Sequence, residues 1–529
     1  MTGGNTLEEL ENIYEVDPGT FRATVERDAS VILEELDAGT FDNSQAIVGL
    51  EWEFYGVMTG SANLRRVPRR VLELIGFEKE LGLHNAEIST RPHPLSAYGL
   101  RAQREELRAL VHAAQQATRI DQIRLVSDGV WTVPPAGETA DRYLGDAITR
   151  TVPRPNGSTR DVTFATNKSD DARYHALSNP NGDVRSGGRI DVPNATFEAE
   201  TVLPGALTTS IQPHYQVPYA VDLPEHFNYA LRVAGPLLAL GVNSPFLPPD
   251  LYDDVPAERI LEDGWAEHRI PVFEGALNDP ERERGKVRFP RDLETVEQAV
   301  HRIAADDLLV ALPVERGTRF DDRFAAFDVK RGTYWRWVRP VFDGATRSSA
   351  NARIEFRPLP GQPTIQDVVA FQAAFAGLME GLPRFEHPVS ALPWSEVRDN
   401  FYAAMRSGLQ ADITWIDANG ERTTSLWACL SELLETSREG LVLAGVDAED
   451  AAATLAPLEA RLEAWTTPAD WRRSRVRRAI EEGATFERAI EEMQAAYVER
   501  QVETLLHGTF ATWPGVEDSG EAPPSSGLD

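Results

Sequence analysis

Three separate segments of this chain alternate large apolar side chains with charged or amide side chains. They read GLEWEFYG at 49–56, IQPHYQ at 211–216 and RIEFR at 353–357. Successive side chains of a β-strand point to opposite faces of a sheet, so each segment is predicted to be a strand with one apolar and one polar face. The polar faces would carry Glu51 and Glu53 on the first strand, Gln212 and His214 on the second, and Arg353, Glu355 and Arg357 on the third.

These polar faces have two interpretations. One is the solvated side of an antiparallel sheet, which fits any one of the strands taken alone. The solvated face of an acidic protein should carry mostly Asp and Glu, however, and these strands carry Gln, His and paired Arg as well. A sheet packed firmly on large apolar residues is also a good support for hard cations, which prefer carboxylate oxygens. The three strands together therefore favour a binding site.

The net charge of the chain indicates the environment in which it works and the kinds of partner it can bind. The 529 residues include 83 Asp and Glu but only 53 Lys and Arg, which gives a formal net charge of -30, and the acidic residues are spread along the chain. Such a composition is typical of proteins that stay soluble in a salt-rich cytosol, where salt screens self-repulsion. It argues against nucleic acid as a partner, because that polyanion needs basic surfaces. We expect a halophilic protein.

Targeting signals, membrane spans and disulfides are not expected. The N-terminal MTGGNTLEELENIYEV has neither a basic region nor an apolar stretch, and no apolar run reaches the roughly eighteen residues of a membrane span. We therefore expect a cytoplasmic protein without a membrane partner. The only cysteine, Cys429, lies in a segment with helical spacing, so it is expected to be a buried apolar residue rather than a nucleophile.

Periodicity along the chain predicts a mixture of helices and strands. Helices are expected within 1–45, at 97–118, 224–246 and 364–382, and almost throughout 391–508. Strands are expected at 46–56, 82–90 and 208–221, and in the segments around 337–342 and 352–358. Residues 150–190 are rich in turn formers and are predicted to be irregular, with a mobile loop, and the tail after 510 is predicted to be disordered.

Several common catalytic motifs are missing from the sequence. There is no G-x-x-x-x-G-K-[ST] loop, no G-x-G-x-x-G, no pair of cysteines and no G-x-S-x-G elbow. If a nucleotide binds to this chain, we expect it to bind through metal ions held by carboxylates and through arginines.

The order of the motifs resembles the carboxylate–amine ligase family that includes bacterial and plant-type glutamate–cysteine ligases (type 2), relatives of glutamine synthetase. VGLEWEFYG is similar to the Glu-x-Glu of the family's first strand, and ELGLHNAEIST resembles the next motif. TTSIQPHYQV, LRVAGPLLALGVNSPF, WVRPVFDG, ARIEFRPLPGQPTIQDVVAFQAAFAGLMEGL and RDNFYAAMRSGLQADI follow in family order. The resemblance covers roughly 46–505. Gln212 stands where many members have His, and residues 1–45 and 245–330 match poorly.

The resemblance implies an α+β fold. Its core would be a glutamine synthetase-like antiparallel sheet that forms a half-open funnel, with helices on the convex side and a helical C-terminal part. The expected division of the chain is a helical N-terminal extension at 1–45, a catalytic domain at 46–390, a helical part at 391–510 packed on that domain, and a disordered tail at 511–529.

The resemblance also implies an activity and a site. Such ligases use ATP and Mg²⁺, or Mn²⁺, to phosphorylate a carboxylate, usually the γ-carboxylate of glutamate, and an amine then displaces the phosphate. The partners would be small-molecule amino-acid substrates, and homo-oligomerisation stays open. The implied metal ligands are Glu51, Glu53, Glu80, Glu87, Gln212, His214 and Glu355. Arg339 and Arg357 would clamp the phosphate and the acyl phosphate, and Arg353 and Thr90 would bind the nucleotide, although Arg353 fits an ion pair at the funnel rim equally well.

Three alternatives stay open at this point. The chain could ligate another amino acid or amine, or it could be a catalytically degenerate member that only binds nucleotide or amino acid. A salt-adapted structural protein is a further alternative, but it would not need polar faces on three strands. The presence of Glu51, Glu53, Glu87, Glu355 and Arg357 argues against a degenerate member.

Overall fold

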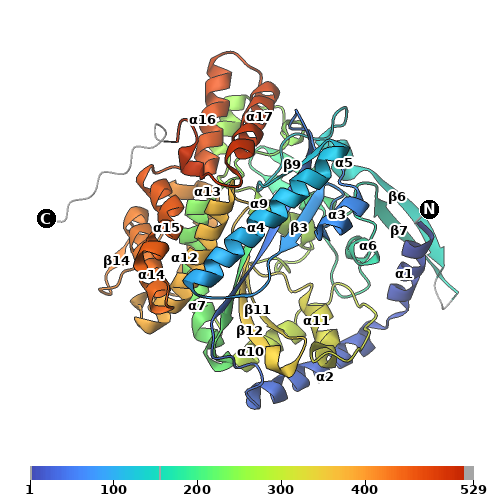
Figure 1. Ribbon diagram of the computed structural model, residues 1–529. Coiled ribbons are helices and arrows are strands. Elements are labelled where there is room, and N and C mark those ends of the chain that lie inside the picture. The colour runs from blue at the N-terminus through green and yellow to red at the C-terminus, as the bar shows by residue number, and fades with distance from the viewer. Residues whose placement is uncertain (1–2, 154–156, 517–529) are drawn as a thin grey trace.

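The computed structural model describes residues 3–153 and 157–516. Its centre is an antiparallel sheet with the strand order β11–β12–β10–β1–β3–β2, in which β1 also pairs with β4 and β5 (Figure 1). The strands are β1 (Ile47–Met58), β2 (Glu78–Lys79), β3 (Asn85–Ser89), β4 (His93–Pro94), β5 (Ile123–Val126), β10 (Ile211–Val217), β11 (Val338–Asp343) and β12 (Asn351–Phe356).

The register of these strands brings the polar faces together on one side of the sheet. The residues that lie directly opposite each other on this side are Glu87 and Glu53, Glu51 and Gln212, His214 and Glu355, and Glu355 and Arg339. Residues far apart in the sequence thus form one continuous polar row across five strands. The polar faces predicted for the three strands therefore lie on one side of the sheet.

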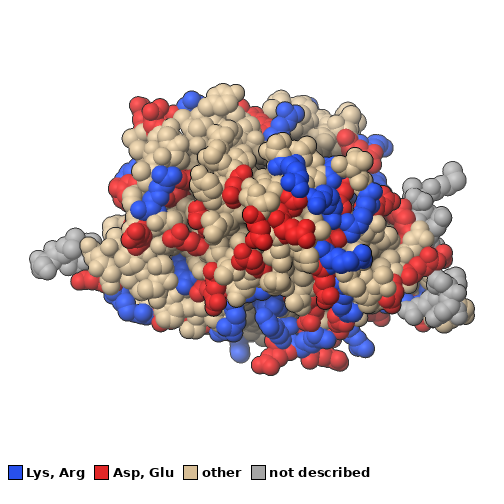
Figure 2. Space-filling model, turned by 90° about the horizontal axis from the view of Figure 1, so that it is seen from below, with Lys and Arg blue, Asp and Glu red and all other residues tan. Residues whose placement is uncertain are grey.

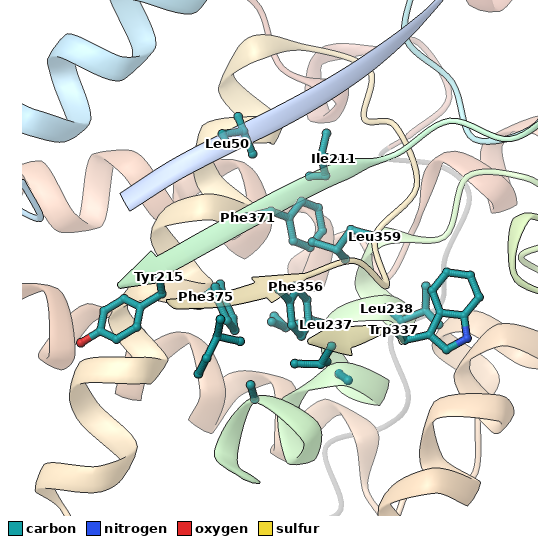
Figure 3. Packing of buried hydrophobic residues seen from close by; sticks show 14 of the residues in the cluster. Leu50, Ile211, Tyr215, Leu237, Leu238, Trp337, Phe356, Leu359, Phe371 and Phe375 are labelled. Carbon is teal, nitrogen blue, oxygen red and sulfur yellow. The ribbon is translucent and has the colours of Figure 1, made fainter. Parts of the chain in front are cut away.

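The apolar faces of the same strands are covered by α7 (Leu223–Gly241) and α12 (Ile365–Arg384), and α4 (Ala97–Thr118) packs on β4 and β5. Figure 3 shows Ile211 and Phe356 of the sheet in one buried cluster with Phe371 and Phe375 of α12. The rings of Phe356 and Phe375 are stacked with their centroids 4.5 Å apart. Burial of each such side chain contributes about 1.5–3 kcal/mol. The expected antiparallel sheet with helices on one side is confirmed.

Two N-terminal helices, α1 (Gly3–Glu15) and α2 (Pro18–Asp37), lie beside the later part of the chain (Figure 1). Helix α2 contacts α10 (Val296–Ala304) and α11 (Ala325–Arg331). Its buried Asp28 forms an ion pair of 2.6 Å with Arg316, and its buried Glu35 pairs with Arg323 and Arg347. These pairs fix the helix to the segment that leads into β11 and β12.

Residues 150–190 are more regular than the sequence analysis predicts. Strands β6 (Ala147–Pro153) and β7 (Thr159–Ala165) form a hairpin, and the helix α6 (Ala172–Ser178) follows. A second small hairpin joins β8 (Arg189–Val192) and β9 (Ala195–Glu198). The irregular assignment was wrong because the Thr, Ile and Val residues of AITRTVP and TRDVTFA favour strands, a signal that the nearby turn formers obscured.

The rest of the chain is mostly helical. Helices α3 (Arg69–Ile75), α5 (Ala140–Gly145), α8 (Ala257–Asp263) and α9 (Arg269–Leu277) flank the sheet segments in the sequence. The C-terminal part contains α13 (Trp394–Ser407), α14 (Leu426–Leu443), α15 (Ala448–Glu463), α16 (Pro468–Glu481) and α17 (Phe486–Thr504), with a short hairpin of β13 (Trp415–Ile416) and β14 (Arg422–Thr423).

Three local expectations can be checked in this part of the chain. Cys429 is buried in α14, as expected. Residues 511–516 belong to the tail predicted to be disordered, yet Trp513 is buried against Trp471 and Tyr497, so this assignment was wrong. Residues 517–529 of the same tail lie outside the described residues. Among the described helices, none has the length and apolar character that crossing a bilayer requires.

Candidate active site

Glutamate side chains crowd one half of the polar face. Glu53 and Glu87 face each other across β1 and β3, and Glu80 lines a small pocket together with Glu53. Burial and, after it, the neighbouring Glu80 raise the pKa of Glu53 to about 7. Burial also raises the pKa of Glu87 well above its usual range, with Glu80 and Glu51 acting in the same direction. Such a group of carboxyls stays partly protonated at neutral pH unless cations balance it.

A second group combines carboxylates with an imidazole. One ligand atom from each of Glu51, His214 and Glu355 lies within 4.8 Å of the others. His214 Nε2 is 3.5 Å from Glu51 Oε1, and this buried nitrogen has no hydrogen-bond partner among the described residues. Burial lowers the pKa of His214, although Glu51 and Glu355 oppose this shift. The ring is therefore neutral at physiological pH.

Two arginines hold Glu355 between them. Arg339 Nε donates a hydrogen bond of 2.8 Å to one carboxylate oxygen of Glu355, and Arg357 donates to the other. Burial alone would raise the pKa of Glu355, but the two guanidinium groups hold it well below its usual range. Burial lowers the pKa of Arg339 to about 10, so this arginine also stays charged at neutral pH. The buried carboxylate thus fixes two cations on the polar face.

Gln212 connects the glutamate Glu53 with Arg357. Its Oε1 accepts a hydrogen bond of 2.5 Å from Arg357, and its Nε2 donates one of 3.0 Å to Glu53. The second oxygen of Glu53 accepts a hydrogen bond of 2.7 Å from the backbone N–H of Ser210. The amide suits this position because it donates to a carboxylate and accepts from a guanidinium at the same time.

Arg269, at the start of α9, is a site residue that the sequence analysis missed. It lines the same small pocket as Glu53, Glu80 and Arg357. Its guanidinium lies 5.2 Å from the ring centroid of Trp337 and donates a hydrogen bond of 3.0 Å to the carbonyl oxygen of Arg357. Strand periodicity could not reveal this residue, because it is supplied by a helix in the segment that matches the family motifs poorly.

The structure does not bring Thr90 to the polar face. Its hydroxyl accepts hydrogen bonds from the backbone N–H of Leu50 (3.1 Å) and from Gln103 of α4 (3.2 Å). Thr90 follows Glu87 by three positions, so the two side chains point to opposite faces of the sheet. The hydroxyl of Thr90 therefore links β1 to α4, and a role of this residue in nucleotide binding stays a prediction.

Arg353 lies on the polar face but is already paired. It forms an ion pair of 3.1 Å with Asp343 and a hydrogen bond of 3.0 Å with Asn351. Its Nε also lies 3.3 Å from Nδ1 of His214. Of the two roles considered for Arg353, these contacts fit the ion pair at the edge of the site, where it also orients the imidazole.

The family relationship of the chain agrees with this arrangement. The model of glutamate-cysteine ligase family 2 matches residues 47–504, which is most of the chain. The protein is therefore a carboxylate–amine ligase, an enzyme that forms C–N bonds. It belongs to glutamate-cysteine ligase family 2. Comparison with curated proteins gives no significant match.

Solved structures give three further similarities. A glutamate–cysteine ligase from Francisella tularensis in complex with AMP is 10% identical with a TM-score of 0.49, over 90% of this chain and 93% of that one. A bifunctional glutathione synthetase from Pasteurella multocida is 14% identical with a TM-score of 0.48, over 90% of this chain and 55% of that one. The ligase PafA, in its complex with the ubiquitin-like protein Pup, is 10% identical with a TM-score of 0.39, over 87% and 73%.

Proposed function

We propose that this ligase uses ATP to convert the γ-carboxylate of glutamate into an acyl phosphate, which an amine, here cysteine, then attacks. The observation that carries the proposal is the division of one polar face into a carboxylate half and an arginine half, joined by Gln212. Phosphoryl transfer to a carboxylate needs both halves, because several negative groups must be brought together and held in line.

The carboxylate half fits Mg²⁺ or Mn²⁺. The ligand atoms of Glu51, His214 and Glu355 are close enough together for one ion, and the buried Nε2 of His214 lacks a partner among the described residues. Burial and the neighbouring carboxyl groups raise the pKa values of Glu53 and Glu87, and a bound cation would oppose this shift. When bound, the ion would offset the repulsion between the phosphates of ATP and the attacking carboxylate.

The arginine half fits the transferred phosphate. Arginine presents a planar fork that matches phosphate oxygens, and Glu355 fixes the guanidinium groups of Arg339 and Arg357 before substrate binds. In the first step a glutamate carboxylate oxygen attacks the γ-phosphorus and ADP leaves. In the second step the amine nitrogen attacks the acyl carbon, the C–O bond breaks, phosphate leaves with the electron pair, and a proton is lost to solvent.

The test is release of ADP and phosphate from ATP in the presence of Mg²⁺. We expect release only when glutamate and an amine acceptor are both present, with amide formed in equal amount. Assays with cysteine and with other small amines in parallel identify the acceptor. Release that is independent of glutamate, or amide formation without ATP, would contradict the proposal.

A further inference from the structure

A second and larger pocket lies apart from the ligase site. Its volume is about 980 Å³, and it shares no lining residue with the pocket formed by Glu53, Glu80, Arg269 and Arg357. It lies where α13 meets the segment around 283–291 and the residues that precede β11. Small-molecule sites of proteins commonly have volumes of about 300–1,000 Å³, so the pocket is large enough for a metabolite.

The charge of this pocket is opposite to that of the whole chain. Asp and Glu outnumber Lys and Arg by 83 to 53 in the sequence, and the two kinds are interspersed over the face shown in Figure 2. The pocket, in contrast, is lined by seven arginines and only four carboxylates. A local excess of arginine in so acidic a protein needs a specific explanation.

Three of the four carboxylates are already neutralised within the protein. Asp306 is buried and pairs with Lys286 and with Arg336, the latter at 2.5 Å. Asp307 pairs with Arg282 at 3.1 Å, and Asp399 pairs with Arg398 at 2.9 Å. The fourth carboxylate, Glu283, is exposed at the rim.

Four of the lining arginines, in contrast, form no ion pair with a carboxylate among the described residues. They are Arg284, Arg291, Arg302 and Arg406. Arg302 donates hydrogen bonds to Gln298 and to the carbonyl oxygen of Arg291, and the other three are exposed to the solvent. The guanidinium of Arg291 lies over the ring of Trp394, 4.2 Å from its centroid. Lys330, which is buried, lies 3.8 Å from the lining residue Asp306. The lining arginines thus outnumber the carboxylates that could neutralise them.

We infer that this pocket binds a small organic or inorganic polyanion with at least two phosphate or carboxylate groups. The unpaired guanidinium groups of Arg284, Arg291 and Arg406 supply donors for such groups, and arginine forks bind both phosphates and carboxylates in a bidentate way. Trp394 and Tyr402 supply an apolar wall for the rest of the ligand. This site is additional to the ligase site and does not depend on the proposed reaction.

The test is isothermal titration calorimetry of the full chain with pyrophosphate and with citrate, in the presence of a chelator and at constant ionic strength. We expect at least one of the two anions to bind. In the double variant R291Q/R406Q the affinity should fall at least about tenfold, because two charge-assisted hydrogen-bond donors are lost. The single variant R284Q, which also removes one unpaired cation, should weaken binding in the same direction.

Two controls separate this site from other arginines. The variant R477Q/R478Q makes the same change of charge on exposed positions of α16 and should bind as the unmodified chain does. The variant R357K alters the ligase site and should retain tight binding at the pocket. The inference is overturned if neither anion binds, if R291Q/R406Q binds as tightly as R477Q/R478Q, or if only R357K abolishes binding. Circular dichroism confirms that each variant is folded.

Discussion

Arg339 and Glu355 lie directly opposite each other on β11 and β12, and Arg339 Nε donates a hydrogen bond of 2.8 Å to the carboxylate. Glu355 is almost completely buried, with 1% of its surface exposed. A buried carboxylate is costly unless it is paired, so this pair is a fixed feature of the polar face. It means that Glu355 serves the arginine half of the site as well as the group of candidate metal ligands.

The substitution Glu355→Gln should therefore disable the enzyme. Glutamine keeps the shape of the side chain but loses the charge that orients Arg339 and Arg357, and it offers one acceptor oxygen where two are used. We expect turnover to fall at least about 100-fold, as when one preorganised electrostatic group is lost. The measurement is phosphate release at saturating ATP, with circular dichroism to confirm folding.

Glu198→Gln is the matched control for this substitution. Glu198 lies on β9, and 73% of its side chain is exposed. Loss of its charge should change turnover little. Near-normal turnover of a folded Glu355→Gln variant, together with a loss in Glu198→Gln, would place the reaction elsewhere in the molecule.

Arg357→Lys should reduce turnover although it keeps the positive charge. The guanidinium of Arg357 reaches both Gln212 and Glu355, and a lysine ammonium cannot reproduce this planar arrangement. We expect kcat to fall at least about tenfold. Arg488→Lys is the control, because Arg488 is an exposed residue of α17 paired only with neighbouring glutamates. Equal kcat values for the two variants would argue against a clamp at Arg357.

Glu53 should make the stability of the metal-free protein depend on pH. Its pKa is about 7 in the folded chain against an ordinary value of 4.5, so the fold favours the protonated form. This contribution is fully present below pH 4.5 and is lost as the pH rises through 7. For a partly exposed group with such a shift we expect a loss of about 2 kcal/mol in the free energy of unfolding.

Urea unfolding between pH 5 and 8 in the presence of a chelator measures this effect. Glu53→Gln resembles the protonated carboxyl at every pH, so its unfolding free energy should fall less steeply with pH than that of the unmodified chain. Other titrating groups are common to both proteins and cancel in the difference. Identical slopes for the two proteins would show that Glu53 does not titrate in this range.

Arg269 should set the pH range of activity through Glu53. Burial and Glu80 raise the pKa of Glu53, whereas Arg269 lowers it. In Arg269→Gln the pKa of Glu53 should therefore rise, and the acidic limb of the kcat/KM profile should move to higher pH, because ionised Glu53 then forms only at higher pH. Arg269→Lys keeps a charge at this position and should shift the profile less. A profile that stays in place in Arg269→Gln would contradict this role.

The strands of the site could be predicted from the sequence because every second side chain of a strand lies on the same face of the sheet. This period places Glu51 with Glu53, Gln212 with His214, and Glu355 with Arg357, and large apolar residues between them identify the buried face. Thr90 lies three residues after Glu87, so the same period places these two side chains on opposite faces, and the hydroxyl of Thr90 contacts Leu50 and Gln103.

Other parts of the site depend on contacts that no local pattern contains. Arg269 comes from a helix, and only the packing of α9 brings it beside Glu53 and over Trp337. The bridge made by Gln212 between Glu53 and Arg357 depends on the register of three strands. The raised pKa of Glu53 likewise follows from burial and from Glu80, which reaches it only in the folded chain.

Transfer of oxygen-18 shows whether the carboxylate is activated as an acyl phosphate. Glutamate labelled with oxygen-18 in its γ-carboxyl group is converted with ATP, Mg²⁺ and cysteine, and the released products are analysed by mass spectrometry. We expect one labelled oxygen in each inorganic phosphate, because the oxygen that joins carbon to phosphorus leaves with the phosphate. Amide formation with unlabelled phosphate, or with label in AMP, would contradict the account.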